Sequence, residues 1–465
     1  MEHIIGMVER ARGAAQGAPI PVILDTRKLI NGHMLFAGMS GMGKSYQLMK
    51  LMAAASRQGI EIDAFDPHEE LDGVPGGVAV KFSEATRAGY NPLELNTDQH
   101  SGGVRRQIAS LLDMINRTSR TLGPRQESAL RNLLSDVYRA RGIDADDPST
   151  WHRDSLGERQ FYDMLRARDY GGLKRYYPIL QDVISYAERK LKSLSLGTDF
   201  VAVNALEKVE RSASRMQALQ TKFRKAGSEE EVDRIEKQML SEKVKAIEAY
   251  TNFIQAIETG REYQDSIKYT NRETLIAVLE RLQGLLESGV MRSNPPDWRG
   301  AAVRVYKVGS LSDDDRKLLF YTRAQAILRE SMDAGKTDQL RRIVLVDEGH
   351  LYYSEDGDNP INRIAKEGRK FGLGLVVGSQ SPTHFSEDFL TNCGSIFLLG
   401  IHENYWDMAA RKLNLSKDLL TSVRPREILL AKMREQGVEG GQFVRVNVDQ
   451  DTIDRGLRAL MQCAA

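Results

Sequence analysis

The sequence predicts an α/β fold in which a mostly parallel sheet is interrupted by a large all-helical insertion. Strand and helix patterns alternate in the first hundred residues, as they do in parallel sheets that helices cover on both faces. From Val104 to about Ser288 the apolar residues recur at helical spacing, and strand patterns return at Ala302. We therefore expect one sheet domain that is split in sequence by a helical block.

The expected domain boundaries follow these changes of pattern. Residues 1–29 are predicted to form a lead-in with a short helix, residues 30–103 and 300–465 the core, and residues 104–299 the helical insertion. Within the insertion, helical spacing from Val209 to Ile257 with a break at Ala226 and Gly227 predicts a helical hairpin. Core strands are expected over residues 34–37, 60–65, 78–82, 302–308, 343–346, 373–378, 395–399, 428–431 and 443–446.

The composition excludes several classes of protein. The 65 Lys and Arg residues balance 64 Asp and Glu residues, so no chain-wide basic field attracts nucleic acid. The two cysteines, Cys393 and Cys463, are too few for a disulfide framework. No stretch approaches the roughly 20 apolar residues that span a bilayer, and the first apolar run is too short for a signal peptide. We expect a cytoplasmic protein, recruited to the inner membrane by other subunits if it acts there.

The most informative segment runs from Gly38 to Ser45 and fits the phosphate-binding pattern GxxxxGK[ST]. A predicted strand precedes it, and a predicted helix follows it until Gly59. This context is the one the motif requires, because backbone N–H groups of the loop and the helix N-terminus must face the phosphates. We expect Lys44 to reach the β and γ phosphates of ATP and Ser45 to bind Mg²⁺. The expected nucleotide-binding residues are Gly38, Ser40, Gly41, Met42, Gly43, Lys44, Ser45, Tyr46 and Asp347.

A pair of acids about 300 positions later completes the pattern of an ATP-hydrolysing site. The apolar residues 343–346 lead directly into Asp347 and Glu348. Asp347 is predicted to orient the water shell of Mg²⁺, and Glu348 to polarise the attacking water. A simple nucleotide binder needs no carboxylate beside the magnesium ligand, so the pair favours hydrolysis. The alternative for Glu348 is a solvated acid at the end of a strand.

Two further side chains are candidates for catalysis. Gln380 follows a predicted core strand, where its amide can bridge the γ-phosphate and the attacking water. Arg369 lies at the end of a predicted helix and is expected to serve a neighbouring subunit as an arginine finger, with Arg363 as the next candidate. The alternative for Arg369 is a surface charge that pairs with Glu367 or with the neighbourhood of Asp347.

These segments together resemble the HerA/FtsK superfamily of ring-forming DNA-translocating ATPases. The resemblance covers residues 30–96 and 341–446 and is closest to the HerA branch and its relatives in conjugation and type IV secretion. It implies a RecA-like P-loop NTPase core, a homohexamer with ATP sites between subunits, and double-stranded DNA in the central channel. The motifs that carry it are the phosphate loop, Phe65-Asp66-Pro67-His68, Val346-Asp347-Glu348, and the segment from Glu367 to Gly374 before Gly378-Ser379-Gln380.

Two departures limit what the resemblance implies. HerA proteins usually carry an N-terminal β-barrel, whereas about 30 residues precede the first predicted strand here. A glycine is expected at the position of Arg426, after Pro425. The large helical insertion is more similar to those of secretion ATPases, and we expect it to contact other subunits or a protein partner.

Three functions stay open at this stage. The first is a motor that moves double-stranded DNA, the second an ATPase that energises a secretion or conjugation machine without moving DNA, and the third an ATP-gated interaction protein. The basic residues from Arg105 to Arg125 and the segment from Lys174 to Tyr177 suit either phosphate contacts or a solvated helix face.

Overall fold

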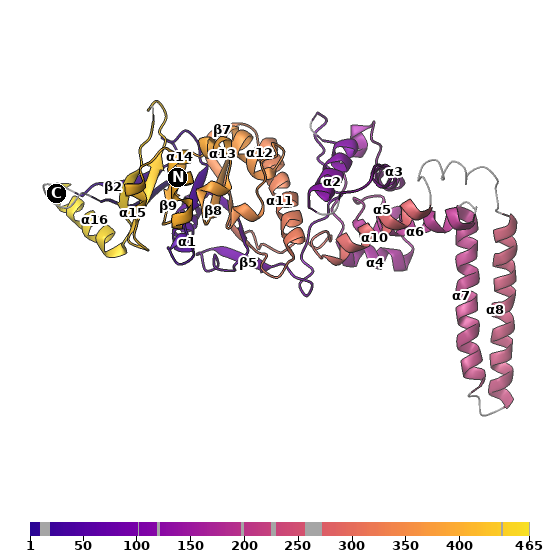
Figure 1. The fold of residues 1–465 in the computed structure, drawn as a ribbon. Helices are drawn as coiled ribbons and strands as arrows, with labels where there is room; N and C mark the ends of the chain where they lie inside the picture. Colours follow the sequence, from indigo (N-terminus) through magenta and orange to yellow (C-terminus); the bar gives the residue numbers. More distant parts are fainter. Residues whose placement is uncertain are drawn as a thin grey trace. The chain divides into compact units, whose positions relative to one another are not determined.

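The computed structural model describes residues 1–9, 19–100, 102–118, 121–196, 200–224, 229–255, 272–438 and 440–464. The chain divides into two compact units, drawn with their helices and strands in Figure 1. The first unit consists of Met1–Gly89 and Pro295–Ala465, and the second of Tyr90–Asn294. The insertion expected at residues 104–299 lies in the second unit except for its last few residues, and the second unit begins earlier in the chain.

The first unit is built on one sheet, in which the described residues form eleven strands in the order β2-β1-β11-β10-β9-β3-β8-β7-β4-β6-β5. The strands from β9 to β5 in this order are parallel, and β10, β11, β1 and β2 continue the sheet in antiparallel pairs. The predicted α/β fold with a mostly parallel sheet is therefore confirmed. The strands are β1 (Glu2–Val8), β2 (Pro21–Asp25), β3 (Met34–Ala37), β4 (Glu61–Asp66), β5 (Gly77–Lys81), β6 (Val303–Lys307), β7 (Thr337–Val346), β8 (Phe371–Ser379), β9 (Ser395–Leu398), β10 (Ile428–Met433) and β11 (Val444–Asn447).

Helices cover both faces of this sheet. Leu48 and Met52 of α1 (Lys44–Arg57) share an apolar cluster with Phe36 of β3. On the opposite face, Phe320 of α11 (Asp313–Asp333) packs edge-on against Phe65 of β4, with ring centroids 5.0 Å apart. Apolar side chains on both faces explain why the central strands read as short continuous apolar runs. The remaining helices are α12 (Pro360–Glu367), α13 (Glu387–Asn392), α14 (Trp406–Leu413), α15 (Lys417–Thr421) and α16 (Gln450–Ala464).

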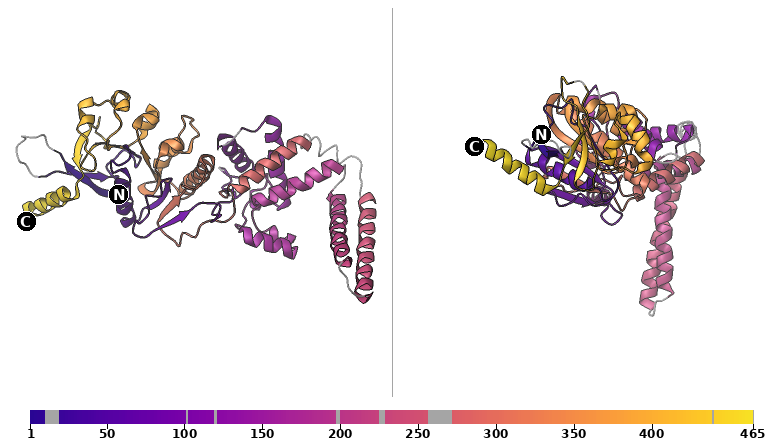
Figure 2. Two further views of the ribbon diagram at one scale, coloured as in Figure 1. Left: turned by 60° about the horizontal axis from the view of Figure 1, so that its bottom comes forward. Right: turned by 60° about the vertical axis from the view of Figure 1, so that its left-hand side comes forward.

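The first residues of the chain correct the sequence prediction. A short helix was expected in the lead-in, but residues 2–8 form β1, which pairs with both β2 and β11. A side chain at Gly6 would overlap the backbone of Asn447 in β11, so glycine permits this close pairing. Figure 2 shows α16 beside the same strands. The strand was missed because its few apolar residues fit a short helix as well as a strand; one of its partners, β2, follows it in the chain, and the other, β11, lies more than 400 positions away.

The second unit is helical, and no β-strand occurs among its described residues. α7 (Phe200–Phe223) and α8 (Glu229–Gln255) lie side by side and antiparallel in every view, which confirms the predicted hairpin (Figures 1 and 2). The break expected at Ala226 and Gly227 lies outside the described residues. The other helices are α2 (Val104–Thr118), α3 (Pro124–Ala140), α4 (Glu158–Ala167), α5 (Tyr170–Leu173), α6 (Leu180–Leu196) and α10 (Arg272–Glu287).

Some of the candidate DNA contacts of the helical unit are engaged within it. Arg105 pairs with Asp146 at 2.6 Å and Arg117 pairs with Asp113 at 2.7 Å. Tyr177 is buried and donates its hydroxyl to a backbone carbonyl at 2.8 Å. Arg117 and Tyr177 thus have partners inside the helical unit, whereas Arg105 stays on its surface in an exposed ion pair. No helix within the described ranges is long and apolar enough to cross a membrane.

Candidate functional site

The glycine-rich loop from Gly38 to Ser45 connects β3 to α1, as the sequence predicts. Gly41 and Gly43 have φ angles of 82° and 92°, in the left-handed region that glycine adopts without steric cost. Helix α1 begins at Lys44 and has no acidic residue in its first turn. Its unpaired N–H groups and the positive end of its dipole are therefore free to bind an anion.

Backbone hydrogen bonds fix the start of the loop at the ends of two neighbouring strands. The N–H of Gly38 donates to the carbonyl of Ser379 at 2.9 Å, and the N–H of Met39 donates to the carbonyl of Gly400 at 2.8 Å. A Cβ atom at Gly38 would lie only 2.9 Å from the Cβ of Leu399. The loop is thus positioned where β8 and β9 end, at the edge of the sheet that carries the strand C-termini.

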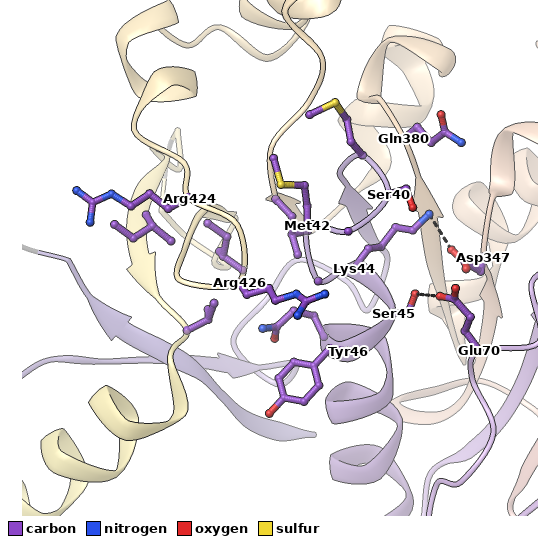
Figure 3. Close-up of a pocket in the computed structure, with 18 of the residues that line it drawn as sticks. Ser40, Met42, Lys44, Ser45, Tyr46, Glu70, Asp347, Gln380, Arg424 and Arg426 are labelled. Carbon is purple, nitrogen blue, oxygen red and sulfur yellow. Dashed lines mark hydrogen bonds and ion pairs between the residues drawn. The ribbon is translucent and has the colours of Figure 1, made fainter.

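A cavity of about 810 Å³ opens over this loop (Figure 3). Its lining combines the phosphate loop with residues that follow β4, β7, β8 and β11 and with the turn before β10. Lys44 and Glu348 meet here although 304 positions separate them in sequence. Gly38 lies at the start of the loop and is not part of the lining. Nearly all the predicted site residues line the cavity, namely Ser40, Gly41, Met42, Gly43, Lys44, Ser45, Tyr46, Asp347, Glu348 and Gln380.

Lys44 forms ion pairs with both predicted acids. Its Nζ lies 3.1 Å from Oδ1 of Asp347 and donates a hydrogen bond to Oε1 of Glu348. The three residues are 7%, 1% and 5% exposed, respectively. Charges this deeply buried must be compensated, so each acid depends on Lys44 in the absence of another cation. The alternative of a solvated Glu348 is excluded by its burial.

The two acids also keep oxygens that the described residues do not satisfy. Oδ2 of Asp347 and Oε2 of Glu348 are buried without a hydrogen-bond partner, although Nδ1 of His350 lies 3.3 Å from the latter. Glu348 has a φ of 48°, which is rare for a non-glycine residue. Buried carboxylate oxygens without donors and a strained backbone are costly, and both are typical of a site that a ligand completes.

Neighbouring strands leave the space that Asp347 occupies. A side chain at Gly378 in β8 would overlap Oδ1 of Asp347, so the strand beside it must carry glycine at this position.

Asp66, at the end of β4, is fully buried and accepts backbone hydrogen bonds from His68 and Leu71 at 3.2 and 2.7 Å. Burial raises the pKa of Asp66, and the negative charge of Asp347 raises it further.

The oxygens around Ser45 fit a magnesium ion. Ser45 donates its hydroxyl to Oε2 of Glu70 at 2.6 Å, and Figure 3 shows both side chains on the same side of the phosphate loop as Asp347. Mg²⁺ takes oxygen ligands and is usually held by one or two protein groups together with phosphates and water. The part of the chain that the structure describes holds no cluster of three or more His, Cys, Asp or Glu residues suited to a metal. A site that shares its ion with the phosphates of a nucleotide is consistent with both observations.

The two remaining candidates lie at opposite ends of β8. Gln380 follows the strand directly and is exposed at the rim of the cavity (Figure 3). Arg369 precedes the strand, and a strand of nine residues separates its two ends by about 25–30 Å. Arg369 therefore lies far from the cavity of its own subunit. Arg369 is exposed, as a surface charge would be, but Glu367 pairs with Arg363 at 3.7 Å and not with Arg369.

Two residues that line the cavity, Glu70 and Arg426, were not predicted from the sequence as site residues. Glu70 was missed because it lies on a turn after β4 and belongs to no motif. Arg426 also lines the cavity, and its φ of 59° explains physically why glycine suits this position. The only signal for Arg426 was its departure from the expected glycine.

Comparison with known proteins gives the family. Residues 5–306 match the family described as Helicase HerA, central domain, which is well over half of the chain. The match includes the helical unit, where the resemblance had been loose, and ends before Asp347. The DNA double-strand break repair helicase HerA of Pyrococcus furiosus is 36% identical over 89 residues, which are 17% of this chain and 16% of that protein.

A probable helicase of Methanocaldococcus jannaschii is 26% identical over 205 residues, which cover 40% of this chain and 39% of the relative. The matched segments thus span well under half the length of these curated relatives. The solved structure of VirB4 of Thermoanaerobacter pseudethanolicus covers 96% of both chains with a TM-score of 0.58 and 17% identity, which shows a shared fold. The chain therefore belongs to the HerA central-domain family, and its fold is that of a RecA-like P-loop NTPase, as the resemblance implied.

Proposed function

We propose that this protein is an ATPase that couples ATP hydrolysis to the translocation of double-stranded DNA. The observation that carries the proposal is the junction of Lys44 with Asp347 and Glu348 in one cavity. Family and fold support an NTP hydrolase. A phosphate loop alone would serve binding, whereas a buried acid beside the lysine supplies a group to activate water.

In this proposal each side chain has a separate role at the triphosphate. The loop N–H groups hold the phosphates, and Lys44 leaves the acids to neutralise the β and γ phosphates. Ser45 and Asp347 hold Mg²⁺, directly or through its water shell. Glu348 then orients the attacking water and accepts its proton, and Gln380 binds the γ-phosphate and the water from the rim.

Replacing Glu348 with glutamine tests the proposed hydrolysis. Glu348→Gln keeps the shape of the side chain but cannot accept the proton, so we expect unchanged ATP binding and a turnover lowered by about 100-fold or more. Fluorescent nucleotide binding and phosphate release measure the two quantities. Glu355→Gln, at an exposed loop position, is the control and should resemble the parent. Unchanged turnover in Glu348→Gln would remove Glu348 from this role.

Turnover with and without DNA separates the motor from its alternative, an ATPase that energises a type IV secretion or conjugation machine. A motor hydrolyses ATP faster when double-stranded DNA is bound, because its cycle is coupled to movement along the duplex. An energiser turns over at a rate that DNA does not change. Binding without turnover under either condition would favour the third alternative, an ATP-gated interaction protein.

The proposed assembly is a homohexamer with nucleotide sites between subunits. Arg369 is exposed and far from its own cavity, so its proposed part in hydrolysis is that of an arginine finger for an adjacent subunit, with Arg363 as the next candidate. A cytoplasmic location, with recruitment to the inner membrane by other subunits, is part of the same proposal.

Docking of a protein partner on the helical insertion stays a prediction. The surface that favours it is a row of apolar side chains along α8, each more than half exposed. The row consists of Leu240, Val244, Ile247, Tyr250 and Ile254.

A further inference from the structure

We propose that Arg426 binds the nucleotide of its own subunit through the α-phosphate, on the side of the cavity away from Glu348. This inference rests on the proposed function, because it concerns the same nucleotide site. The inference adds Arg426, an arginine that belongs to none of the sequence motifs described above. Its contact would contribute to binding of the nucleotide and not to the chemical step. Arg369, by contrast, is proposed to act on the transferred phosphate of a neighbouring subunit.

The turn that carries Arg426 is held firmly in place. The N–H groups of Glu427 and Ile428 both donate to the carbonyl of Arg424, at 3.2 and 3.1 Å, and the N–H of Arg424 donates to the carbonyl of Ile428 at 3.0 Å. The N–H of Val448, just after β11, donates to the carbonyl of Glu427 at 2.8 Å. The sheet thus fixes the turn, and Arg426 lies at its tip.

This turn brings the side chain of Arg426 onto the phosphate loop. Its Cγ lies 3.4 Å from the position of a Cβ atom built on Gly43, the last residue before α1. Figure 3 shows the guanidinium beside Ser45 and Tyr46, across Lys44 from Asp347. Arg424 also lines the cavity, but its guanidinium points away from the loop in the same view, and it pairs with Glu427 at 3.3 Å.

The order of the groups along the loop indicates which phosphate of the nucleotide lies beside Arg426. Lys44 and the two acids mark the end where the γ-phosphate and Mg²⁺ bind, since the lysine of this motif reaches the β and γ phosphates. The nucleotide continues from that end past Ser45 toward Tyr46 in the first turn of α1, where the N–H groups of the helix N-terminus hold the α-phosphate. Arg426 is therefore beside the α-phosphate, which is not transferred in hydrolysis.

The positive charges around Arg426 favour the binding of an anion beside it. Arg426 has no hydrogen bond or ion pair among the described residues, and it lies beside the positive end of α1, whose first turn has no acid. A cation at a helix N-terminus is unfavourable unless an anion lies between them. Arg426 also holds a φ of 59°, which glycine would adopt more easily. A bound phosphate offsets both costs.

The test compares nucleotide affinity with turnover in the full-length protein. Arg426→Gly removes the cation and relieves the backbone, so the variant should fold at least as well as the parent in a thermal melt without nucleotide. We expect its dissociation constants for MANT-ADP and MANT-ATP to rise together by about 10-fold, with the maximal rate of hydrolysis unchanged, because an exposed charge-assisted contact is lost equally in both complexes. Arg426→Lys should recover part of the affinity, and Arg424→Ala should match the parent.

Each other result overturns the assignment. Unchanged affinities in Arg426→Gly would show that the side chain does not contact the nucleotide. A lower maximal rate with unchanged MANT-ADP affinity would give Arg426 a role in the transition state instead. A lower melting temperature with unchanged affinity would make its role structural. Failure of the proposed function is distinct, because the parent protein itself would then bind MANT-ATP without hydrolysing it, or would bind no MANT-ATP, whatever residue stands at position 426.

Discussion

At the scale of single residues, the sequence was most informative where a motif states both the residue type and its surroundings. The loop from Gly38 to Ser45 and the acid pair at Asp347 were predicted because an apolar strand precedes each of them. Glu70 and Arg426 were not, since they lie on turns whose position depends on strands far away in the sequence. A motif therefore located the reacting end of the cavity but not the end beside Arg426.

Gly378 offers a test of how tightly the acids are positioned. Its absent side chain leaves the space filled by Oδ1 of Asp347, so Gly378→Ala must push Asp347 out of place or distort β8. We expect turnover to fall by about 100-fold, as for other misplaced catalytic groups, and stability to fall by about 1–3 kcal/mol. Gly284→Ala, at an open helical position, is the control for adding a methyl group. Normal turnover in Gly378→Ala would show that Asp347 is free to shift without consequence.

At the scale of helices and strands, prediction succeeded where the spacing of apolar residues decides between helix and strand and failed where a segment is too short for the spacing to decide. The hairpin of α7 and α8 and the parallel strands were recovered because spacing within each segment decides its type. β1 was mistaken for a helix, because Ile4, Ile5, Met7 and Val8 fit either pattern until a partner strand is known. The partners are β2, the next strand in the chain, and β11, at the other end of the chain.

His33 joins three strands and gives the sheet a predictable response to acid. Its Nδ1 accepts the N–H of Leu375 in β8 at 3.1 Å, and its carbonyl accepts the N–H groups of Gly394 and Ser395 next to β9. Complete burial lowers the pKa of His33 to about 4, and the nearby charge of Arg369 adds to the effect. The folded protein therefore excludes a proton that the unfolded chain binds below about pH 6.5.

The stabilisation from neutral His33 is thus fully present above pH 6.5 and is lost as the pH falls toward 4. The loss amounts to about 3 kcal/mol across this window. We expect His33→Asn to have a shallower decline in stability between pH 7.5 and pH 5, measured by urea unfolding with hydrogen exchange in β3 and β9. His68→Asn, at an exposed histidine, should follow the parent. Equal declines for all three proteins would refute the assignment to His33.

At the scale of the whole molecule, the sequence predicted that one sheet domain is split by a helical block but not how copies of the chain assemble. The split follows from the 304 positions between Lys44 and Glu348, which is more than a single domain usually spans. Assembly depends on surfaces, and surface residues carry little pattern. What the fold adds is the location of Arg369 at the far end of β8, which excludes action on its own cavity.

Mixing two inactive variants tests whether Arg369 acts between subunits. Lys44→Ala subunits cannot bind phosphates but keep Arg369, whereas Arg369→Ala subunits keep the phosphate loop and lack the arginine. In a ring assembled from equal amounts of both, about a quarter of the interfaces join an intact loop to an intact arginine. We therefore expect the mixture to recover up to that fraction of parental ATPase activity, while each variant alone stays inactive. Replacing Arg363 instead of Arg369 is the control. Arg363 is the finger if Arg369→Ala retains activity while Arg363→Ala is inactive and recovers activity when mixed with Lys44→Ala. If neither mixture recovers activity, these arginines do not complete a neighbouring site.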